Sequence, residues 1–168
     1  MNIYNNSVGG NATFLLNIPP TPEGLLHEND VKRLTELGAY LQKAFGTDIL
    51  PEAALSSDGI NIEAVRTDNY DEYFTTERGK NTAVITASWK HTVSIGNIVL
   101  KENIRMGQRV EKFIVEARVN GVFTEIYSGT VIGYKRIVSK KISADAIRIT
   151  ITDSRTEPTL SFIGIYSC

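Results

Sequence analysis

Several predicted loops carry residue types that could hold a carbohydrate. Tyr134, Lys135 and Arg136 place an aromatic ring beside two cations, and Arg109 lies in a neighbouring loop. A ring can cover the C–H face of a sugar while charged donors fix its hydroxyl groups. Tyr73, in a third loop, offers a second ring. The same residues also allow a purely structural interpretation, in which the rings fill the core and the arginines cap strand ends.

Loop 66–80 contains a cluster of oxygen-bearing side chains. Asp68, Asn69 and Asp71 could bind calcium, which prefers oxygen ligands. Asp and Asn are also common in turns, where their side chains bond to nearby backbone groups. Calcium is therefore the one cofactor that the sequence suggests, since Walker, H-E-x-x-H, G-x-S-x-G and C-x-x-C motifs are lacking.

No catalytic residue is predicted. Glu23 and Glu28 lie ahead of a predicted helix, where carboxylates serve as polar loop residues and as favourable charges at the helix N-terminus. His27 and His91 are the only histidines. Their spacing fits neither a metal site nor a Ser-His-Asp arrangement.

The composition is that of an ordinary globular chain. It has 168 residues, 42% of them hydrophobic, and a formal net charge of -1. This balance offers no basic surface for nucleic acid, and no apolar segment reaches the roughly 20 residues of a membrane helix. We therefore expect neither a nucleic-acid partner nor membrane insertion. The single cysteine, Cys168, excludes an internal disulfide, and the first residues lack the features of a signal peptide.

Residues 1–46 are predicted to form a strand, a loop and a helix. The run at 11–18 is almost continuously apolar in its middle, as in a strand buried on both faces of a parallel sheet. A helix follows, with Asn29 as its N-cap and Gly46 just after its end. A parallel strand needs neighbours. We therefore expect residues 11–18 to pair with an edge of the same chain or with another copy.

The rest of the chain has an all-β pattern. Residues 47–59 contain Pro, Ser and Gly and are predicted to be a linker. Strands are predicted at 60–65, 82–89, 92–100, 110–119, 122–128, 136–142, 145–152 and 159–166. Asn120-Gly121 is a strong hairpin signal between two of them. Short strands with regularly spaced turns predict a β-sandwich or jelly roll over residues 60–168.

Two stretches resemble one enzyme family. Residues 11–41 read NATFLLNIPPTPEGLLHENDVKRLTELGAYL, with a leucine run, an N-I-P-P turn and a D-V-K-R-L-T-E-L-G helix. This combination resembles the end of the catalytic barrel of glycoside hydrolase family 29 α-L-fucosidases. Residues 97–137 and the closing PTLSFIGIY are similar to the galactose-binding-like sandwich, also called discoidin or coagulation factor 5/8 type C, that follows this barrel in many of those enzymes.

The resemblance implies a C-terminal region of such an enzyme. Residues 1–46 would be the last βα unit of a (β/α)8 barrel, and residues 60–168 an accessory sandwich. The catalytic Asp and Glu of the family fall outside the matched stretches, so this chain alone would be inactive. Its partners would be the missing barrel or another copy of the chain, and fucosylated or galactosylated glycans. Enzymes of the family are commonly periplasmic or secreted.

Two other functions remain open. One is a stand-alone carbohydrate-binding module, which would show saturable glycan binding that depends on Tyr134 or Arg136. The other is a protein-interaction sandwich, which would show a large exposed apolar patch and no affinity for sugars.

Overall fold

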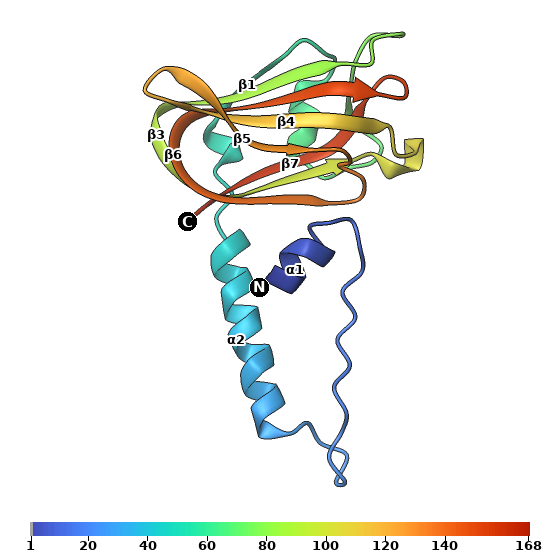
Figure 1. Ribbon diagram of the computed structural model, residues 1–168, viewed down its shortest axis with the longest axis vertical. Coiled ribbons are helices and arrows are strands. Elements are labelled where there is room, and N and C mark those ends of the chain that lie inside the picture. Colours follow the sequence, from blue (N-terminus) through green and yellow to red (C-terminus); the bar gives the residue numbers. More distant parts are fainter. Residues whose placement is uncertain (1) are drawn as a thin grey trace.

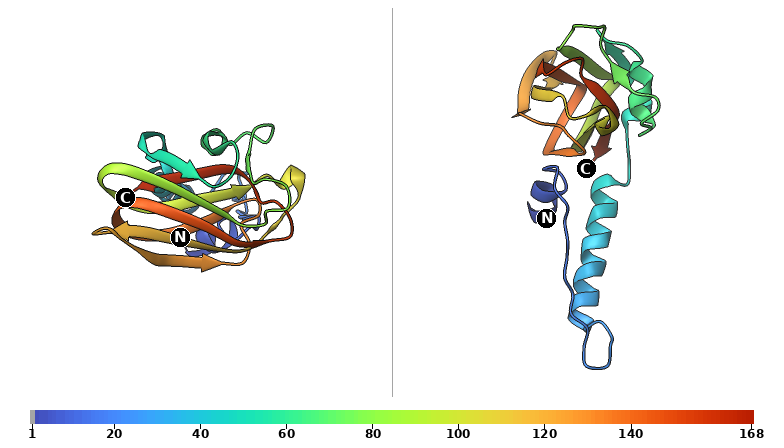
Figure 2. Two further views of the ribbon diagram at one scale, coloured as in Figure 1. Left: turned by 90° about the horizontal axis from the view of Figure 1, so that it is seen from above. Right: turned by 90° about the vertical axis from the view of Figure 1, so that its right-hand side faces the viewer.

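The computed structural model describes residues 2–168. It consists of a β-sandwich and a long N-terminal extension that projects from it (Figure 1). The extension contains the short helix α1 (Asn2–Ser7), an extended segment and helix α2 (Glu28–Phe45). The extended segment runs away from the sandwich and turns at its far end, and α2 then runs back toward the sandwich beside it (Figure 2). Among the described residues, no helix combines the length and apolar character of a membrane span.

Helix α2 forms where the sequence predicted a helix, with different ends. His27, not Asn29, is the N-cap, and its ring Nδ1 accepts a hydrogen bond from the Asn29 amide at 3.2 Å. Gly46 follows the last helical residue but has right-handed backbone angles, so it does not form the left-handed cap expected. Although α2 is described in full, none of its residues is buried.

The segment at residues 11–18 is extended but is not a strand. Within residues 2–168, no backbone hydrogen bond joins residues 13–20 to another segment, so the expected pairing with an edge of the sandwich is absent. The expected burial on both faces is also wrong for this chain, because Leu15 is 88% exposed. A parallel strand is buried only when neighbouring strands and helices cover it, and no strand within the described range pairs with this segment.

The sandwich is one antiparallel sheet folded into two layers, with the strand order β2-β7-β3-β6-β4-β5 and β1 paired with β3. Its strands are β1 (Ala54–Ser57), β2 (Phe74–Thr75), β3 (Ala83–Glu102), β4 (Val110–Val119), β5 (Val122–Gly129), β6 (Arg136–Ser154) and β7 (Thr159–Ser167). This confirms the predicted mainly β fold (Figure 1).

Two long strands connect the layers. The first half of β3 pairs with β1 and with the second half of β6, and its second half pairs with the first half of β6 and with β7. The register of β3 shifts between Ser88 and Val93, where the strand passes from one layer to the other. The sequence predicted two separate strands in each case. The structure joins them, because the local pattern breaks at a bend and not at a turn.

Residues 47–66 pack closely against the sandwich. Residues 47–59, expected to be a linker, contain a short helix at Leu50–Glu52 and strand β1. Leu50 is buried, and the indole nitrogen of Trp89 donates to the Ile49 carbonyl at 3.0 Å. The strand expected at 60–65 is instead a short helix, Ile62–Arg66. Buried apolar side chains inside both segments explain why they are ordered.

The core lies between the two layers. Its largest fully buried side chains come mainly from β3, β4, β6 and β7 and include Phe113, Ile85, Ile147, Ile149 and Leu160. Each fully buried side chain of this kind contributes about 1.5–3 kcal/mol. Trp89 belongs to this core at 7% exposure, as its alternation with apolar neighbours predicted.

The outer face of one layer meets the extension. In the second half of β3, Ile98 and Leu100 belong to the core, while Val99 and Lys101 alternate with them and point outward. Both outward residues are also buried. Residues of α1 and of the end of α2 line the cleft over this face, and Asp68, Tyr134 and Phe162 surround the Lys101 ammonium. The candidate site lies at this junction.

A candidate binding cleft between the sandwich and the extension

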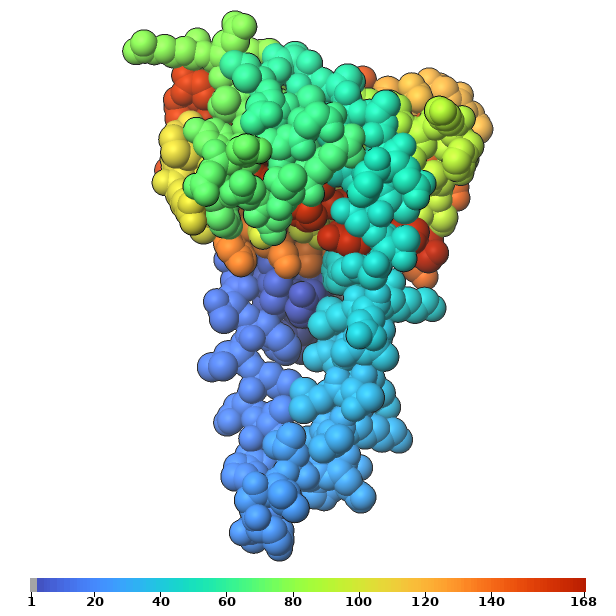
Figure 3. Space-filling view, turned by 180° about the vertical axis from the view of Figure 1, so that it is seen from behind, coloured from blue at the N-terminus to red at the C-terminus, as the bar shows by residue number. Residues whose placement is uncertain are grey.

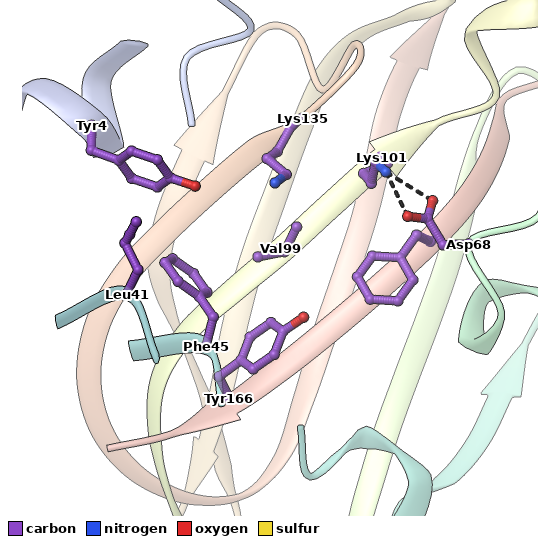
Figure 4. Close-up of a pocket in the computed structure, with 9 residues that line it drawn as sticks. Tyr4, Leu41, Phe45, Asp68, Val99, Lys101, Lys135 and Tyr166 are labelled. Atoms are coloured by element: carbon purple, nitrogen blue, oxygen red, sulfur yellow. Dashed lines mark hydrogen bonds and ion pairs between the residues drawn. The ribbon is translucent and has the colours of Figure 1, made fainter. Parts of the chain in front are cut away.

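The cleft has a volume of about 320 Å³ and brings together α1, α2, β3 and β7. It is lined by Tyr4, Leu41, Phe45, Asp68, Val99, Lys101, Lys135, Phe162 and Tyr166. Figure 4 shows these side chains around a common space above Val99. A cavity of this size is at the lower end of the range for small-molecule sites.

An ion pair between a buried lysine and an exposed aspartate closes one end of the cleft. The Lys101 ammonium contacts both carboxylate oxygens of Asp68, at 2.9 and 2.6 Å. The same nitrogen lies 5.2 Å from the ring centroid of Tyr134 and 6.0 Å from that of Phe162. A lysine with only 10% of its side chain exposed is therefore held by a carboxylate and by two aromatic rings.

Lys135 contributes a second ammonium without a counter-ion of its own. Burial lowers its pKa below the usual lysine range, and repulsion by Lys101 adds to this effect, while Asp68 opposes it. Within residues 2–168 no hydrogen bond or ion pair engages its nitrogen, which Figure 4 shows pointing into the cleft. With one carboxylate and two ammonium groups, the cleft carries one excess positive charge.

Aromatic rings form the wall toward the extension. Phe45 meets Tyr166 edge to face at a centroid distance of 5.4 Å and Tyr4 at 6.3 Å. Burial, followed by the nearby Asp48 and Asp68 charges, raises the pKa of Tyr166, so its phenol stays protonated. The protonated hydroxyl remains available as a hydrogen-bond donor.

The predicted carbohydrate-binding residues do not gather in one site. Lys135 lines the cleft, and Tyr134 lies beside it with 52% of its surface exposed. Arg136 donates from Nε to the Val131 carbonyl at 2.9 Å, which is the strand-end contact of the structural interpretation. Tyr73 lines none of the described cavities.

Arg109 is held away from the cleft. Its Nη1 donates to the Glu157 carbonyl at 2.8 Å, and its Nε donates to the Met106 carbonyl at 3.2 Å. The loops of Arg109 and Tyr134 nevertheless meet, because buried Glu102 joins them. Its Oε1 accepts from the Arg109 amide at 2.7 Å, and its Oε2 accepts from the Gly133 amide at 2.6 Å.

The three calcium candidates have other partners. Asp68 pairs with Lys101, and Asp71 pairs with Arg105 at 2.9 Å. Asn69 accepts a hydrogen bond from the Asp71 amide, which is the turn contact that Asn side chains commonly make. In the described part of the chain, no three His, Cys, Asp or Glu side chains gather as a metal site would require.

The extension exposes apolar surface away from the cleft. Phe14, Leu16 and Ile18 face Leu34 and Leu37 of α2 across an opening of about 300 Å³. The space-filling view shows the two arms of the extension standing clear of the sandwich, with narrow openings between them (Figure 3). The extension is therefore loosely packed compared with the sandwich.

The sandwich has a fold that is also found in carbohydrate-binding modules. The sandwich has the architecture of the CBM32 domains of Clostridium perfringens ZmpB, which match 79% of this chain with a TM-score of 0.63 and 12% identity. At that identity the likeness concerns the fold alone. No protein-family model matches the chain.

Closer relatives cover nearly the whole chain, extension included. The curated alpha-L-fucosidase 1 of Arabidopsis thaliana is 31% identical over 99% of this chain. A Ruminococcus gnavus GH29 fucosidase in complex with fucose matches 99% of the chain with a TM-score of 0.92 and 29% identity. The crystal structure of SpGH29 matches the same share with a TM-score of 0.88 and 30% identity.

These matches confirm the resemblance to the C-terminal part of GH29 α-L-fucosidases. The chain spans 35% of the length of the Arabidopsis protein and 35% of the Ruminococcus protein. What the complete relatives bind or catalyse is therefore a property of longer proteins.

Proposed function

We propose that this chain is the C-terminal accessory region of an α-L-fucosidase-like glycoside hydrolase that acts on fucosylated glycans. In this role it is not catalytic and docks against the catalytic part. One observation carries the proposal: residues 13–20 are extended with no backbone partner within residues 2–168, beside a helix that has no buried residue.

An exposed apolar segment with free backbone groups is suited to pairing with a docked strand. Leu15 points away from α2 with 88% exposure, while Leu16 faces the helix and is still 49% exposed. Burial of each leucine by docked strands would contribute about 1.5–3 kcal/mol. The free N–H and C=O groups of the same segment can pair with the strands that cover it. Leu25 and Val31 extend the exposed apolar surface at the far end.

The proposal that the chain is inactive rests on its carboxylates. Retaining glycoside hydrolysis needs two carboxyl groups about 5–5.5 Å apart across the scissile bond. Three of the carboxylates already have structural partners: Glu102 accepts backbone amides, Glu116 pairs with Arg148, and Asp58 pairs with Lys80. Glu23, in the loop where a catalytic face would lie, is exposed on the projecting extension.

Inactivity is tested by an assay of the purified chain with an aryl α-L-fucoside. The expected result is no turnover above buffer. Turnover that co-elutes with the chain through successive purification steps would contradict the proposal.

Docking is tested with a chimera. The chain replaces the matching C-terminal part of the Ruminococcus gnavus fucosidase, and activity is compared with that of the enzyme lacking this part. The chimera should be soluble and active, and Leu15→Asp in the extension should abolish both its solubility and its activity. Val122→Asp, at an exposed apolar position of the sandwich, is the matched control and should have no effect. Equal effects of the two substitutions would contradict docking through the extension.

A further inference from the structure

We propose that the cleft between the sandwich and the extension binds a small ligand with one negative charge and several hydroxyl groups, namely an acidic monosaccharide of the uronic acid type. This inference goes beyond the accessory role. The two proposals are tested independently, because ligand binding is measured on this chain alone and does not involve fucoside turnover.

Charge is the first argument. Asp68 neutralises Lys101 through both of its oxygens, which leaves the ammonium of Lys135 uncompensated in a partly buried site. A partly buried charge without a partner is costly. A bound carboxylate would satisfy it with a charge-assisted hydrogen bond, and it would oppose the burial and the Lys101 repulsion that lower the pKa of Lys135.

Hydrogen-bonding groups are the second argument. The hydroxyls of Tyr4 and Tyr166 and the ammonium of Lys135 come from α1, β7 and the residue before β6, and all three lie on the cleft (Figure 4). None of them hydrogen-bonds to another group within residues 2–168. Three free polar groups around one cavity suit a ligand that carries several hydroxyl groups.

Apolar lining is the third argument. Val99 forms the floor with the ring of Phe45 beside it (Figure 4), and Phe162 also lines the cleft. Rings beside cations are the combination that holds a sugar by its C–H face and its polar edge together. The volume of about 320 Å³ suits one such unit, not a long glycan.

The charge balance favours a carboxylate over a phosphate. A phosphate near neutral pH carries up to two negative charges and is typically held by several cations or by a helix N-terminus. Here a single ammonium is unpaired, and the Asp68 carboxylate nearby would repel a dianion. A monoanion matches the one excess charge and is repelled less by Asp68, whose charge Lys101 offsets.

The test is a calorimetric titration of the full chain with four probes: glucuronate, glucose, acetate and inorganic phosphate. Glucuronate should bind saturably and more tightly than the others, because glucose lacks the charge and acetate lacks the hydroxyls. Lys135→Met should weaken glucuronate binding by about tenfold or more, the value of a charge-assisted hydrogen bond. Lys140→Met, an exposed lysine in β6, is the matched control and should leave the affinity unchanged.

A second variant separates binding from folding. Tyr166→Phe removes only the hydroxyl and keeps the ring that packs on Phe45. It should weaken glucuronate binding severalfold while the circular dichroism spectrum stays that of the unmodified chain. The proposal is overturned if folded chain shows no saturable glucuronate binding, if acetate, glucose or phosphate binds as tightly, or if Lys140→Met weakens binding as much as Lys135→Met.

Discussion

Asn97 donates a hydrogen bond from its side-chain amide to the main-chain carbonyl of Ala44, with 3.0 Å between nitrogen and oxygen. This bond joins β3 to the last turn of α2, where helix carbonyls lack partners within the helix. Phe45 packs on Tyr166 immediately beside it. The cleft is thus built on a junction that specific contacts hold in place.

Asn97→Ala should loosen this junction without unfolding the sandwich. The Ala44 carbonyl loses its partner in a covered position, which costs about 1 kcal/mol or more. Hydrogen exchange should therefore speed up for the amides in the last turn of α2 and stay unchanged in β4. Ser139→Ala, at the exposed residue that faces Asn97 on β6, is the control. Unchanged exchange in α2 would show that the hydrogen bond contributes nothing to the junction.

Glu102→Gln should be among the most destabilising single substitutions in the sandwich. The fully buried carboxylate accepts amides from Arg109, Val110 and Gly133, at 2.7, 2.9 and 2.6 Å. An amide side chain has one acceptor oxygen and places an N–H₂ group against at least one of these donors.

Leaving buried donors without an acceptor should lower the free energy of unfolding by about 2–3 kcal/mol, measured by urea denaturation. Glu125→Gln on the exposed surface of β5 is the matched control and should change it by less than about 0.5 kcal/mol. Similar losses in the two variants would mean that Glu102 does not organise these loops.

Two glycine substitutions should change stability in opposite directions. Asn120 and Gly121 have φ values of 52° and 80°, which suits a two-residue hairpin turn between β4 and β5. Gly121→Ala forces an alanine into this left-handed region and should cost about 1–2 kcal/mol. Gly38→Ala, in α2, meets no atom within 4 Å and should gain about 0.5–1 kcal/mol. Thermal denaturation of both variants checks the pair, and a shift of the same sign in both would contradict the assigned conformations.

The sequence predicted this hairpin well because its signals are local. Alternation over β4 and β5 and the Asn-Gly turn are all found within neighbouring residues, and the structure confirms them. The helix α2 was also predicted from its own periodicity. Its N-cap was predicted wrongly, because the imidazole of His27 accepts the capping hydrogen bond, whereas asparagine is a more common N-cap residue than histidine.

The cleft could not be predicted from the sequence. Lys101 and Asp68 are 33 residues apart, and their contact depends on how loop 66–80 lies against the end of β3. Tyr166 and Phe45 meet only because the extension docks on β7. Residues 11–18 could not be placed from the sequence either, because their pattern is that of a strand covered on both faces and no strand within residues 2–168 pairs with them.

Glu157 should titrate far below an ordinary glutamate. Hydrogen bonds from the Gly79 amide, at 2.6 Å, and from the Thr156 hydroxyl lower its pKa from 4.5 to about 2. Because the pKa is depressed in the folded state, the stabilisation is present above pH 4.5 and is lost as the pH falls toward 2. Glu157→Gln should therefore flatten the acid limb of the stability–pH curve in urea titrations. Glu77→Gln, which removes an exposed carboxylate nearby, is the control and should leave that limb unchanged; parallel curves for the unmodified chain and Glu157→Gln would refute the assignment.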